Sequence, residues 1–370
     1  MKIIAAPDSF KGTISAVKVC EIMADAVISV DCDAEVIKIP VADGGEGTVD
    51  SFGAEKIYAD VTGSDHKKLR SYYGVLNENE TVIIEMAACA GLPLTELKNP
   101  ELTTTYGVGE LILHALDNGY RKFVIGLGGS ATNDGGTGMA SALGVKFINA
   151  AGESFIPVGG TLIDIAHVDI SGIDARVKES RFTAMCDIDN PLYGERGAAY
   201  IFAPQKGADS EMVKRLDNAL IHFSDVIKSD LRIDISRLSG GGAAGGMGAG
   251  VYAFLNSELK SGIDVVLDTV GFDNHLNGAD CVISGEGKFD DQSIHGKVVS
   301  GIAGRVKNKG IPFIVIAGSV DDSVDIKNTG ITAVFSIQRT PLPFTEAVLR
   351  SENDLFHTVK NVINILYKLY

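Results

Sequence analysis

Two aspartates in the segment CDIDNPL (residues 186–192) have the spacing that chemistry on a hydroxyl group requires. The apolar residues before them predict a strand over residues 182–189, and alternation along a strand would direct Asp187 and Asp189 to the same face. One carboxylate, with Asp189 the first choice, could then accept a proton from a hydroxyl while Asp187 holds Mg²⁺ or takes the alternate role. The alternative is an Asx turn before Pro191, in which the carboxylates bind the backbone.

Three lysines next to glycine supply the opposite charge. They are Lys11 in PDSFKG, Lys206 in APQKGA and Lys297 in HGK. Phosphoryl transfer consists mainly of positioning and charge neutralisation, so lysines in such loops are candidates for neutralising a phosphate or a carboxylate. The competing interpretation of each lysine, taken alone, is a solvated surface group.

A glycine-rich segment, GLGGSATNDGGTGM (residues 126–139), follows the apolar run KFVI. Its glycines would let backbone amides face a ligand, and a helix that starts after them would add a positive dipole end. The residues expected to face phosphates are Gly128, Gly129, Ser130 and Thr132. Asn133 and Asp134 could cap this helix or bind a cation-bridged phosphate.

A second glycine-rich run covers residues 239–250 and contains GxGxxG at residues 240–245. It lacks a clear preceding strand and a following acidic residue for a ribose, so a dinucleotide site is disfavoured there.

Three polar loops follow apolar runs that predict strands. They are PDSFKG (7–12), ADGGEGT (42–48) and SGEGKFDDQS (284–293). Ligands of open parallel sheets bind at the carboxyl ends of the strands, so these loops are expected to meet around one ligand site. The expected substrate-binding residues are Asp8, Ser9, Asp43, Glu46 and Asp290, and Glu286 is expected to serve the nucleotide.

The elements that would position these loops indicate an α/β protein with two domains. Apolar strands at 2–6, 35–40, 280–284, 312–318 and 333–337 alternate with helices, which predicts one flavodoxin-like parallel sheet built from both chain ends. Residues 56–88 show short strands with turn signals, typical of antiparallel pairing. Helices are expected over 106–118, 209–229, 295–309 and 345–368. We therefore expect a flavodoxin-like domain over 1–55 and 264–370, interrupted by a mixed α/β domain over 56–263.

Composition excludes several classes of function. The 370 residues are 45% hydrophobic and 22% charged, as in globular proteins, and carry a net charge of −15 without a basic run that could bind nucleic acid or an anionic membrane. No run of about 18 apolar residues could span a membrane. Five scattered cysteines and an N-terminus unlike a signal peptide predict a cytoplasmic protein. P-loop, protein kinase, GxSxG and zinc motifs are absent.

Seven motifs in order, PDSFKG, ADGGEGT, GLGGSATNDGG, CDIDNPL, APQKGA, GGAAGGMGA and SGEGKFDDQS, closely resemble those of the type I glycerate kinase family. The resemblance covers essentially the whole chain. It implies transfer of a phosphoryl group from ATP to D-glycerate with Mg²⁺, most often at the 2-position. It also implies a flavodoxin-like domain interrupted by a second α/β domain, with the site in the cleft between them.

Two other functions stay open on the residues alone. One is a dehydrogenase or lyase that uses the glycine-rich loops for a dinucleotide or a phosphorylated substrate. The other is a non-enzymatic sensor of a sugar acid, which would need neither Mg²⁺ nor the acidic loops. The sequence also leaves open which hydroxyl is phosphorylated, and whether the chain forms a homo-oligomer.

Overall fold

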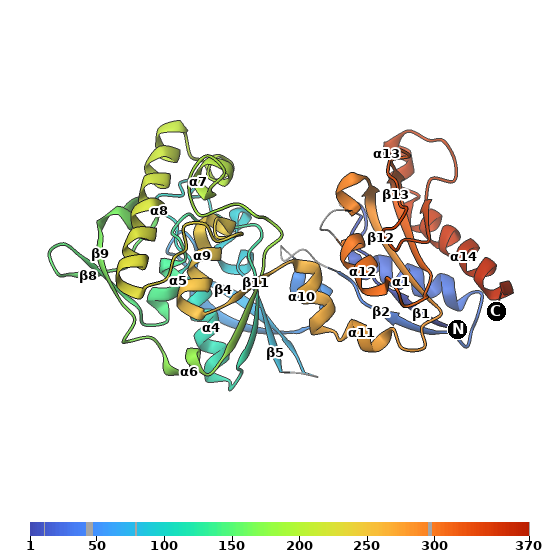
Figure 1. The fold of residues 1–370 in the computed structure, drawn as a ribbon, viewed down its shortest axis with the longest axis horizontal. Helices are drawn as coiled ribbons and strands as arrows, with labels where there is room; N and C mark the ends of the chain where they lie inside the picture. Colours follow the sequence, from blue (N-terminus) through green and yellow to red (C-terminus); the bar gives the residue numbers. More distant parts are fainter. Residues whose placement is uncertain (11, 42–46, 78–79, 295–297, 370) are drawn as a thin grey trace. The chain divides into compact units, whose positions relative to one another are not determined.

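The computed structural model describes residues 1–370 with the exception of 11, 42–46, 78–79, 295–297 and 370. The chain divides into two compact units, each with a sheet of its own (Figure 1). Unit 1 comprises residues 1–42, 50–52 and 263–370, and unit 2 comprises residues 43–49 and 53–262. Both ends of the sequence therefore belong to unit 1, and unit 2 contains the middle.

Unit 1 is built on a five-stranded sheet in which every pairing is parallel. In spatial order its strands are β14 (Ala333–Ser336), β13 (Phe313–Val320), β12 (Cys281–Phe289), β1 (Lys2–Ala5) and β2 (Glu35–Lys38). The direction of winding reverses between β1 and β12, which is the switch point of a flavodoxin-like sheet. The flavodoxin-like parallel sheet expected from both chain ends is confirmed.

Both faces of this sheet are buried, as parallel sheets require. Ile3 and Ala5 join a hydrophobic cluster with the helices α1 (Ala16–Ile28) and α14 (Ser351–Leu369). Ile4 is equally buried but lies outside that cluster, because alternate side chains of a strand point to opposite faces. The helix α12 (Val298–Val306) contacts β13 and is also outside the cluster, so it covers the opposite face.

Unit 2 is built on a six-stranded mixed sheet, as the sequence predicted for the middle region. In spatial order its strands are β11 (Glu258–Lys260), β10 (Arg181–Met185), β6 (Lys122–Gly126), β5 (Thr81–Glu85), β4 (Lys68–Leu76) and β3 (Glu55–Thr62). The pairs β3–β4 and β4–β5 are antiparallel, and the other three pairs are parallel. The antiparallel pairing predicted from residues 56–88 is confirmed.

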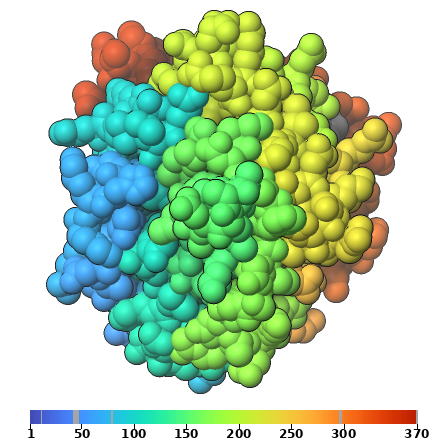
Figure 2. All heavy atoms as spheres, turned by 90° about the vertical axis from the view of Figure 1, so that its left-hand side faces the viewer, coloured from blue at the N-terminus to red at the C-terminus, as the bar shows by residue number. Residues whose placement is uncertain are grey.

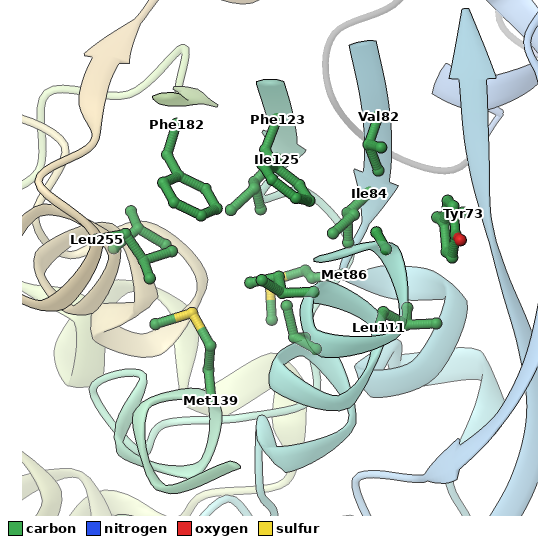
Figure 3. Close-up of a cluster of buried hydrophobic side chains, with 14 of the residues drawn as sticks. Tyr73, Val82, Ile84, Met86, Leu111, Phe123, Ile125, Met139, Phe182 and Leu255 are labelled. Carbon is green, nitrogen blue, oxygen red and sulfur yellow. The ribbon is translucent and has the colours of Figure 1, made fainter. Parts of the chain in front are cut away.

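The core of unit 2 lies between this sheet and the helices α4 (Tyr106–Asp117), α5 (Thr137–Ala142) and α9 (Ala243–Leu255) (Figure 3). The rings of Phe123 and Phe182, from neighbouring strands, stack at 4.7 Å between centroids. Leu111, Met139 and Leu255 come from the three helices and complete the same cluster. This packing fixes the carboxyl ends of β6 and β10, after which come the glycine-rich loop and the loop that carries Asp187 and Asp189.

A small antiparallel sheet in unit 2 was not predicted from the sequence. It consists of β8 (Ser154–Phe155), β7 (Lys146–Asn149) and β9 (Ile165–Asp169), and it packs against the long helix α8 (Ser210–Leu231). Figure 2 shows the green residues of this sheet on the face turned to the viewer. Phe147 and Phe223 are fully buried in a second cluster that joins this sheet to α8.

The other helices are short. They are α2 (Thr48–Ser51), α3 (Ala87–Ala90), η1 (Leu92–Leu94), η2 (Gly159–Asp164), α6 (Ala175–Lys178), α7 (Ala198–Phe202), η3 (Pro204–Lys206), α10 (Gly262–Thr269), α11 (Phe272–His275), η4 (Asp291–Ile294) and α13 (Phe344–Val348). The η elements are 3₁₀-helices. Among the described residues, no helix is both long and apolar enough to cross a membrane.

Two predicted elements were wrong at their ends. The strand expected over 182–189 stops at Met185, where its neighbour β11 runs out. The single helix expected over 345–368 is two helices, α13 and α14, separated at Leu349 and Arg350. The helix expected over 295–309 is described from Val298, and its first three residues lie outside the described part of the chain.

Candidate functional site

A buried lysine is the centre of the most unusual polar group in unit 2. Lys206 ends the 3₁₀-helix η3 just before α8, and only 2% of it is exposed. Its ammonium group donates hydrogen bonds of 2.8 Å to Oγ of Ser130 and 2.6 Å to the backbone oxygen of Thr132. Both acceptors lie in the glycine-rich loop that follows β6. We call Ser130, Thr132, Asn133, Asp134 and Lys206 the Lys206 cluster.

Burial sets the charges in this cluster. Removal from water lowers the pKa of Lys206 to about 7, against a smaller opposing effect of the Asp134 carboxylate. Burial also raises the pKa of Asp134, although its carboxylate accepts hydrogen bonds from the backbone and the hydroxyl of Thr105 and from the backbone of Gly136. The cluster thus holds an amine and a carboxyl group whose charged forms are disfavoured by burial, in a medium that screens charge poorly.

Three polar side-chain atoms of the cluster have no hydrogen-bond partner among the described residues. They are Oγ1 of Thr132 and both Oδ1 and Nδ2 of Asn133, and the two residues are fully buried. Buried polar atoms are nearly always hydrogen-bonded, and an exception needs an explanation such as a functional role. The amide group of Asn133 can both donate and accept hydrogen bonds, and the hydroxyl of Thr132 can donate one beside the buried Lys206. These groups suit a polar, anionic ligand.

The turn before the cluster needs glycine. Gly129 has φ +74°, in the left-handed region, and its carbonyl accepts a hydrogen bond from Leu92. Gly128 is half-buried and Gly129 is exposed, whereas Ser130 is buried. The four residues expected to face phosphates therefore share one loop, but Thr132 is directed into the protein rather than to the surface.

Asp187 and Asp189 lie in the loop after β10, outside any helix or strand. Because β10 ends at Met185, strand alternation does not govern Asp187 and Asp189. Asp187 is exposed and its carboxylate accepts a 2.7 Å hydrogen bond from the backbone of Gly262 at the start of α10. Asp189 is also exposed and binds Arg196 through both carboxylate oxygens, at 3.0 and 2.9 Å. The two carboxylates thus have different hydrogen-bond partners, Gly262 and Arg196, and both are open to solvent.

A third group of predicted residues lines a cavity of about 460 Å³ in unit 1. Asp8 and Ser9 reach it from the end of β1, and Glu286 and Asp290 from the end of β12. The carboxylate of Asp8 accepts a 2.6 Å hydrogen bond from the backbone of Ser9. Asp290 forms an ion pair with Lys288 at 3.1 Å. The polar loops after β1 and β12 therefore do converge, as expected of loops beside a switch point.

Four predicted site residues, Lys11, Asp43, Glu46 and Lys297, lie outside the described residues. Glu85, which is buried at the end of β5, was not predicted as a site residue. Its carboxylate accepts hydrogen bonds from the backbone of Val49 at 2.5 Å and from the hydroxyl of Tyr72 at 3.3 Å. The signal was present, because an acidic residue ends the apolar run TVIIE (81–85).

The described part of the chain has no preformed metal-binding site. Among the residues described, no three His, Cys, Asp or Glu side chains are grouped so as to hold an ion. Mg²⁺ in phosphoryl-transfer enzymes usually takes only one or two carboxylates and completes its shell with water and substrate phosphates. The exposed carboxylates of Asp187 and Asp189 fit that requirement.

The GxGxxG motif at 240–245 follows an irregular segment rather than a strand. Because a dinucleotide site needs this motif directly after a strand, its position argues against such a site.

Comparison with known proteins decides the family. The model of the glycerate kinase family matches residues 3–367. The chain belongs to the glycerate kinase family. The resemblance inferred from the seven motifs is thereby confirmed, and with it a phosphotransferase that acts on an alcohol group of glycerate with ATP as the donor.

Individual relatives cover nearly the full chain. It is 47% identical to a glycerate kinase of Bacillus cereus over 98% of this chain and 97% of that one. It is 44% identical to a glycerate 2-kinase of Escherichia coli, with the same coverage. The crystal structure of a putative glycerate kinase 2 from Salmonella typhimurium superposes with a TM-score of 0.89 at 41% identity, covering 100% of this chain and 98% of that chain.

Proposed function

We propose that the chain transfers the γ-phosphoryl group of ATP to the 2-hydroxyl group of D-glycerate, in the presence of Mg²⁺, to give 2-phosphoglycerate and ADP. Membership of the family supports the reaction, and the E. coli relative named glycerate 2-kinase supports the position. We further propose that it acts in the cytoplasm. The described cysteines are all free thiols, which suits a reducing compartment.

The Lys206 cluster is the observation that carries the proposal. A phosphoryl group in transfer spreads negative charge over its oxygens, and preorganised donors stabilise it best where water is excluded. Lys206 is too buried to reach a ligand in the structure described, so we assign it as a positioning residue that holds Ser130 and Thr132 in place. Ser130 and the backbone of Gly128 and Gly129 are the groups proposed to face the phosphates, and the fully buried Thr132 is proposed to support them from inside the loop.

Asp189 is our proposed general base. It takes the proton of the glycerate hydroxyl as the oxygen attacks the γ-phosphorus and the bond to ADP breaks. Its exposed carboxylate and its pairing with a single exposed arginine leave it accessible to a substrate. Asp187 is its alternate, or a ligand of Mg²⁺. When bound, the ion would neutralise charge on the phosphates of ATP.

The remaining assignments rest on the sequence. Lys11 and Lys297 are proposed to neutralise the glycerate carboxylate and the transferring phosphate, and Asp43 and Glu46 to bind glycerate. Asp8, Ser9 and Asp290, proposed from the sequence for the same ligand, share a cavity with Glu286, proposed for the nucleotide. That shared position raises the question of which ligand the cavity takes.

One ³¹P NMR experiment tests the reaction and its position together. The purified protein is incubated with ATP, Mg²⁺ and D-glycerate, and the product signal is compared with authentic 2- and 3-phosphoglycerate. We expect equal amounts of ADP and 2-phosphoglycerate, and none without Mg²⁺. ATP hydrolysis without an organic phosphate, or no ADP at all, would refute the proposal, and 3-phosphoglycerate would refute the position.

A further inference from the structure

The cavity of unit 1 has a position that favours a nucleotide. Its lining includes residues at or after the carboxyl ends of four of the five strands, namely Ser9 after β1, Asp290 after β12, Ser319 near the end of β13 and Ile337 after β14. This is the carboxyl edge of a doubly wound sheet beside its switch point, the place where such folds bind ligands.

The size of the cavity distinguishes the two substrates. Cavities that enclose drug-sized ligands have volumes of about 300–1,000 Å³, and this one has about 460 Å³. A purine nucleoside is a ligand of that size. Glycerate has only three carbons and would leave most of the cavity empty, with few of its groups in contact with the wall.

The charge of the cavity lining also favours a nucleoside over glycerate. Four carboxylates line the cavity, from Asp8, Glu286, Asp290 and Asp354, and Lys288 is the one cation among its described lining residues. Lys288 is itself paired with Asp290. Such a lining repels a carboxylate or a triphosphate but accepts hydrogen bonds from the hydroxyl groups of a ribose, the role that acidic residues play in dinucleotide folds.

One wall of the cavity is apolar. It is formed by Ile337, Leu342, Phe344 and Val348, the last two from the short helix α13. Phe344 is 77% exposed although it is among the most hydrophobic residues of the chain. A flat aromatic ligand that stacked on Phe344 would remove this ring from water, and stacking on a base is worth more than the buried area alone.

We infer that this cavity binds the adenosine part of ATP, with the base against Phe344 and Val348 and the ribose hydroxyls toward Glu286 and Asp290. The inference rests on the proposed function, because it takes ATP as the donor. It places the adenosine site in unit 1. Asp8, Ser9 and Asp290, proposed from the sequence to bind glycerate, would then bind the nucleotide instead.

The test uses a pair of variants at the two ends of the short helix α13. Phe344→Ala removes the exposed ring from the cavity wall, and Leu349→Ala removes a side chain that is 86% exposed and does not line the cavity. We expect Phe344→Ala to raise KM for ATP about tenfold, the effect of losing one stacked aromatic contact. Its kcat and its KM for D-glycerate should stay within about twofold of wild type, as should all parameters of Leu349→Ala.

A second variant fills the cavity. Ala347→Phe adds a ring inside the lining, and its melting temperature reports whether the fold survives. Calorimetric titration with adenosine alone, which carries no phosphate, should detect binding to the wild type and to Leu349→Ala, and at least about tenfold weaker binding to a folded Ala347→Phe. If that variant does not fold, the comparison is made with Phe344→Ala.

The outcomes separate the inference from the function. A rise in KM for glycerate with no change for ATP would assign the cavity to glycerate, and unchanged constants for both substrates would remove it from the site. Either result overturns the inference while phosphoryl transfer by the wild type still stands. Adenosine binding that depends on Phe344 in a protein without kinase activity would instead refute the proposed function and keep a nucleoside site.

Discussion

The ammonium group of Lys206 donates a 2.8 Å hydrogen bond to Oγ of Ser130, and both residues are buried although they lie 76 positions apart in the sequence. A second bond from the same group holds the carbonyl of Thr132. A single side chain therefore fixes two points of the loop proposed to bind phosphate. This arrangement separates the role of Lys206 from that of a lysine that contacts substrate directly.

Replacing Lys206 by methionine tests that role. The variant Lys206→Met keeps a long apolar side chain but removes both hydrogen bonds, so the loop loses its support. We expect kcat/KM for the kinase reaction to fall by about 10²–10³, the usual effect of losing preorganised donors. Lys214→Met, at an exposed lysine of α8, is the matched control and should retain wild-type rates. Near-normal turnover of folded Lys206→Met would eliminate the positioning role.

The lowered pKa of Lys206 predicts a dependence of stability on pH. The lysine has a pKa of about 7 in the folded protein and 10.5 in the reference state, so between these values the unfolded chain binds more protons. The free energy of unfolding then rises with pH in this window, and below pH 7 the full penalty of burying the charge applies. Relative to Lys206→Met, wild type should gain stability from about pH 7 to about pH 9, by at most about 1.4 kcal/mol per pH unit.

Chemical denaturation at several pH values measures this difference. Asp134 faces the same lysine and has a raised pKa, and an acid of that kind loses stability as pH rises above its unfolded value of 3.8. The comparison is therefore made above pH 7, where the lysine contributes with the opposite sign. A constant difference between wild type and Lys206→Met across that range would show that Lys206 keeps its charge when buried.

The variants Asp189→Asn and Asp187→Asn distinguish the base from the metal ligand. If Asp189 is the base, Asp189→Asn should lower kcat by about 10²–10⁴ with a modest change in KM. If Asp187 binds the ion, Asp187→Asn should raise the Mg²⁺ concentration that gives half-maximal activity. Addition of EDTA should abolish the activity of all forms, and excess Mg²⁺ should restore it.

The controls for these aspartates come from the same loop. Glu195→Gln changes an exposed acid one position before Arg196, and Arg196→Gln breaks the ion pair while leaving the carboxylate of Asp189. Exposed ion pairs contribute only about 0–1 kcal/mol, so neither variant should lower the melting temperature appreciably. If Arg196→Gln lost as much turnover as Asp189→Asn, the ion pair rather than the base would be the essential feature.

Asn133 offers a test in which stability and activity should change in opposite directions. Its amide atoms are buried without partners in the described part of the chain. Asn133→Leu should therefore raise the free energy of unfolding, by about 1–3 kcal/mol, because an unsatisfied buried polar group is removed. The same change should lower kcat/KM at least tenfold if these atoms serve the reaction. Asn361→Leu, at an exposed site of α14, is the control.

A loss of stability in Asn133→Leu with unchanged activity would contradict this account. It would mean that the amide is satisfied in solution and serves only the fold.

The sequence predicted the parts of this protein that depend on local pattern. The runs 2–6, 280–284 and 312–318 form neighbouring parallel strands, and short unbroken apolar runs of this kind are typical of strands buried on both faces. The carboxyl ends of β1 and β12 then had to bring Asp8 and Glu286 together, so their shared cavity follows from topology. The family followed from seven ordered motifs rather than from any single residue.

Features set by distant packing were beyond prediction. Lysine is rarely buried, and nothing near Lys206 in the sequence indicates the acceptors at Ser130 and Thr132. The strand before Asp187 stops at Met185, where its pairing with both neighbours, β6 and β11, ends, and β11 lies more than 70 positions away in the sequence. The wall formed by Phe344 depends on a break between α13 and α14 that helical periodicity does not signal.

The pairing of β1 with β12 has a consequence for synthesis of the protein. Ile3 lies opposite Cys281, so one edge of the first strand must wait for a partner made almost 280 residues later. At about 5–20 residues per second this delay is about 15–60 s. The six-stranded sheet of unit 2 ends at Lys260 and can be completed within that interval. Unit 2 can therefore form while the chain is still attached to the ribosome, whereas β1 and β2 keep an open edge until the last hundred residues emerge.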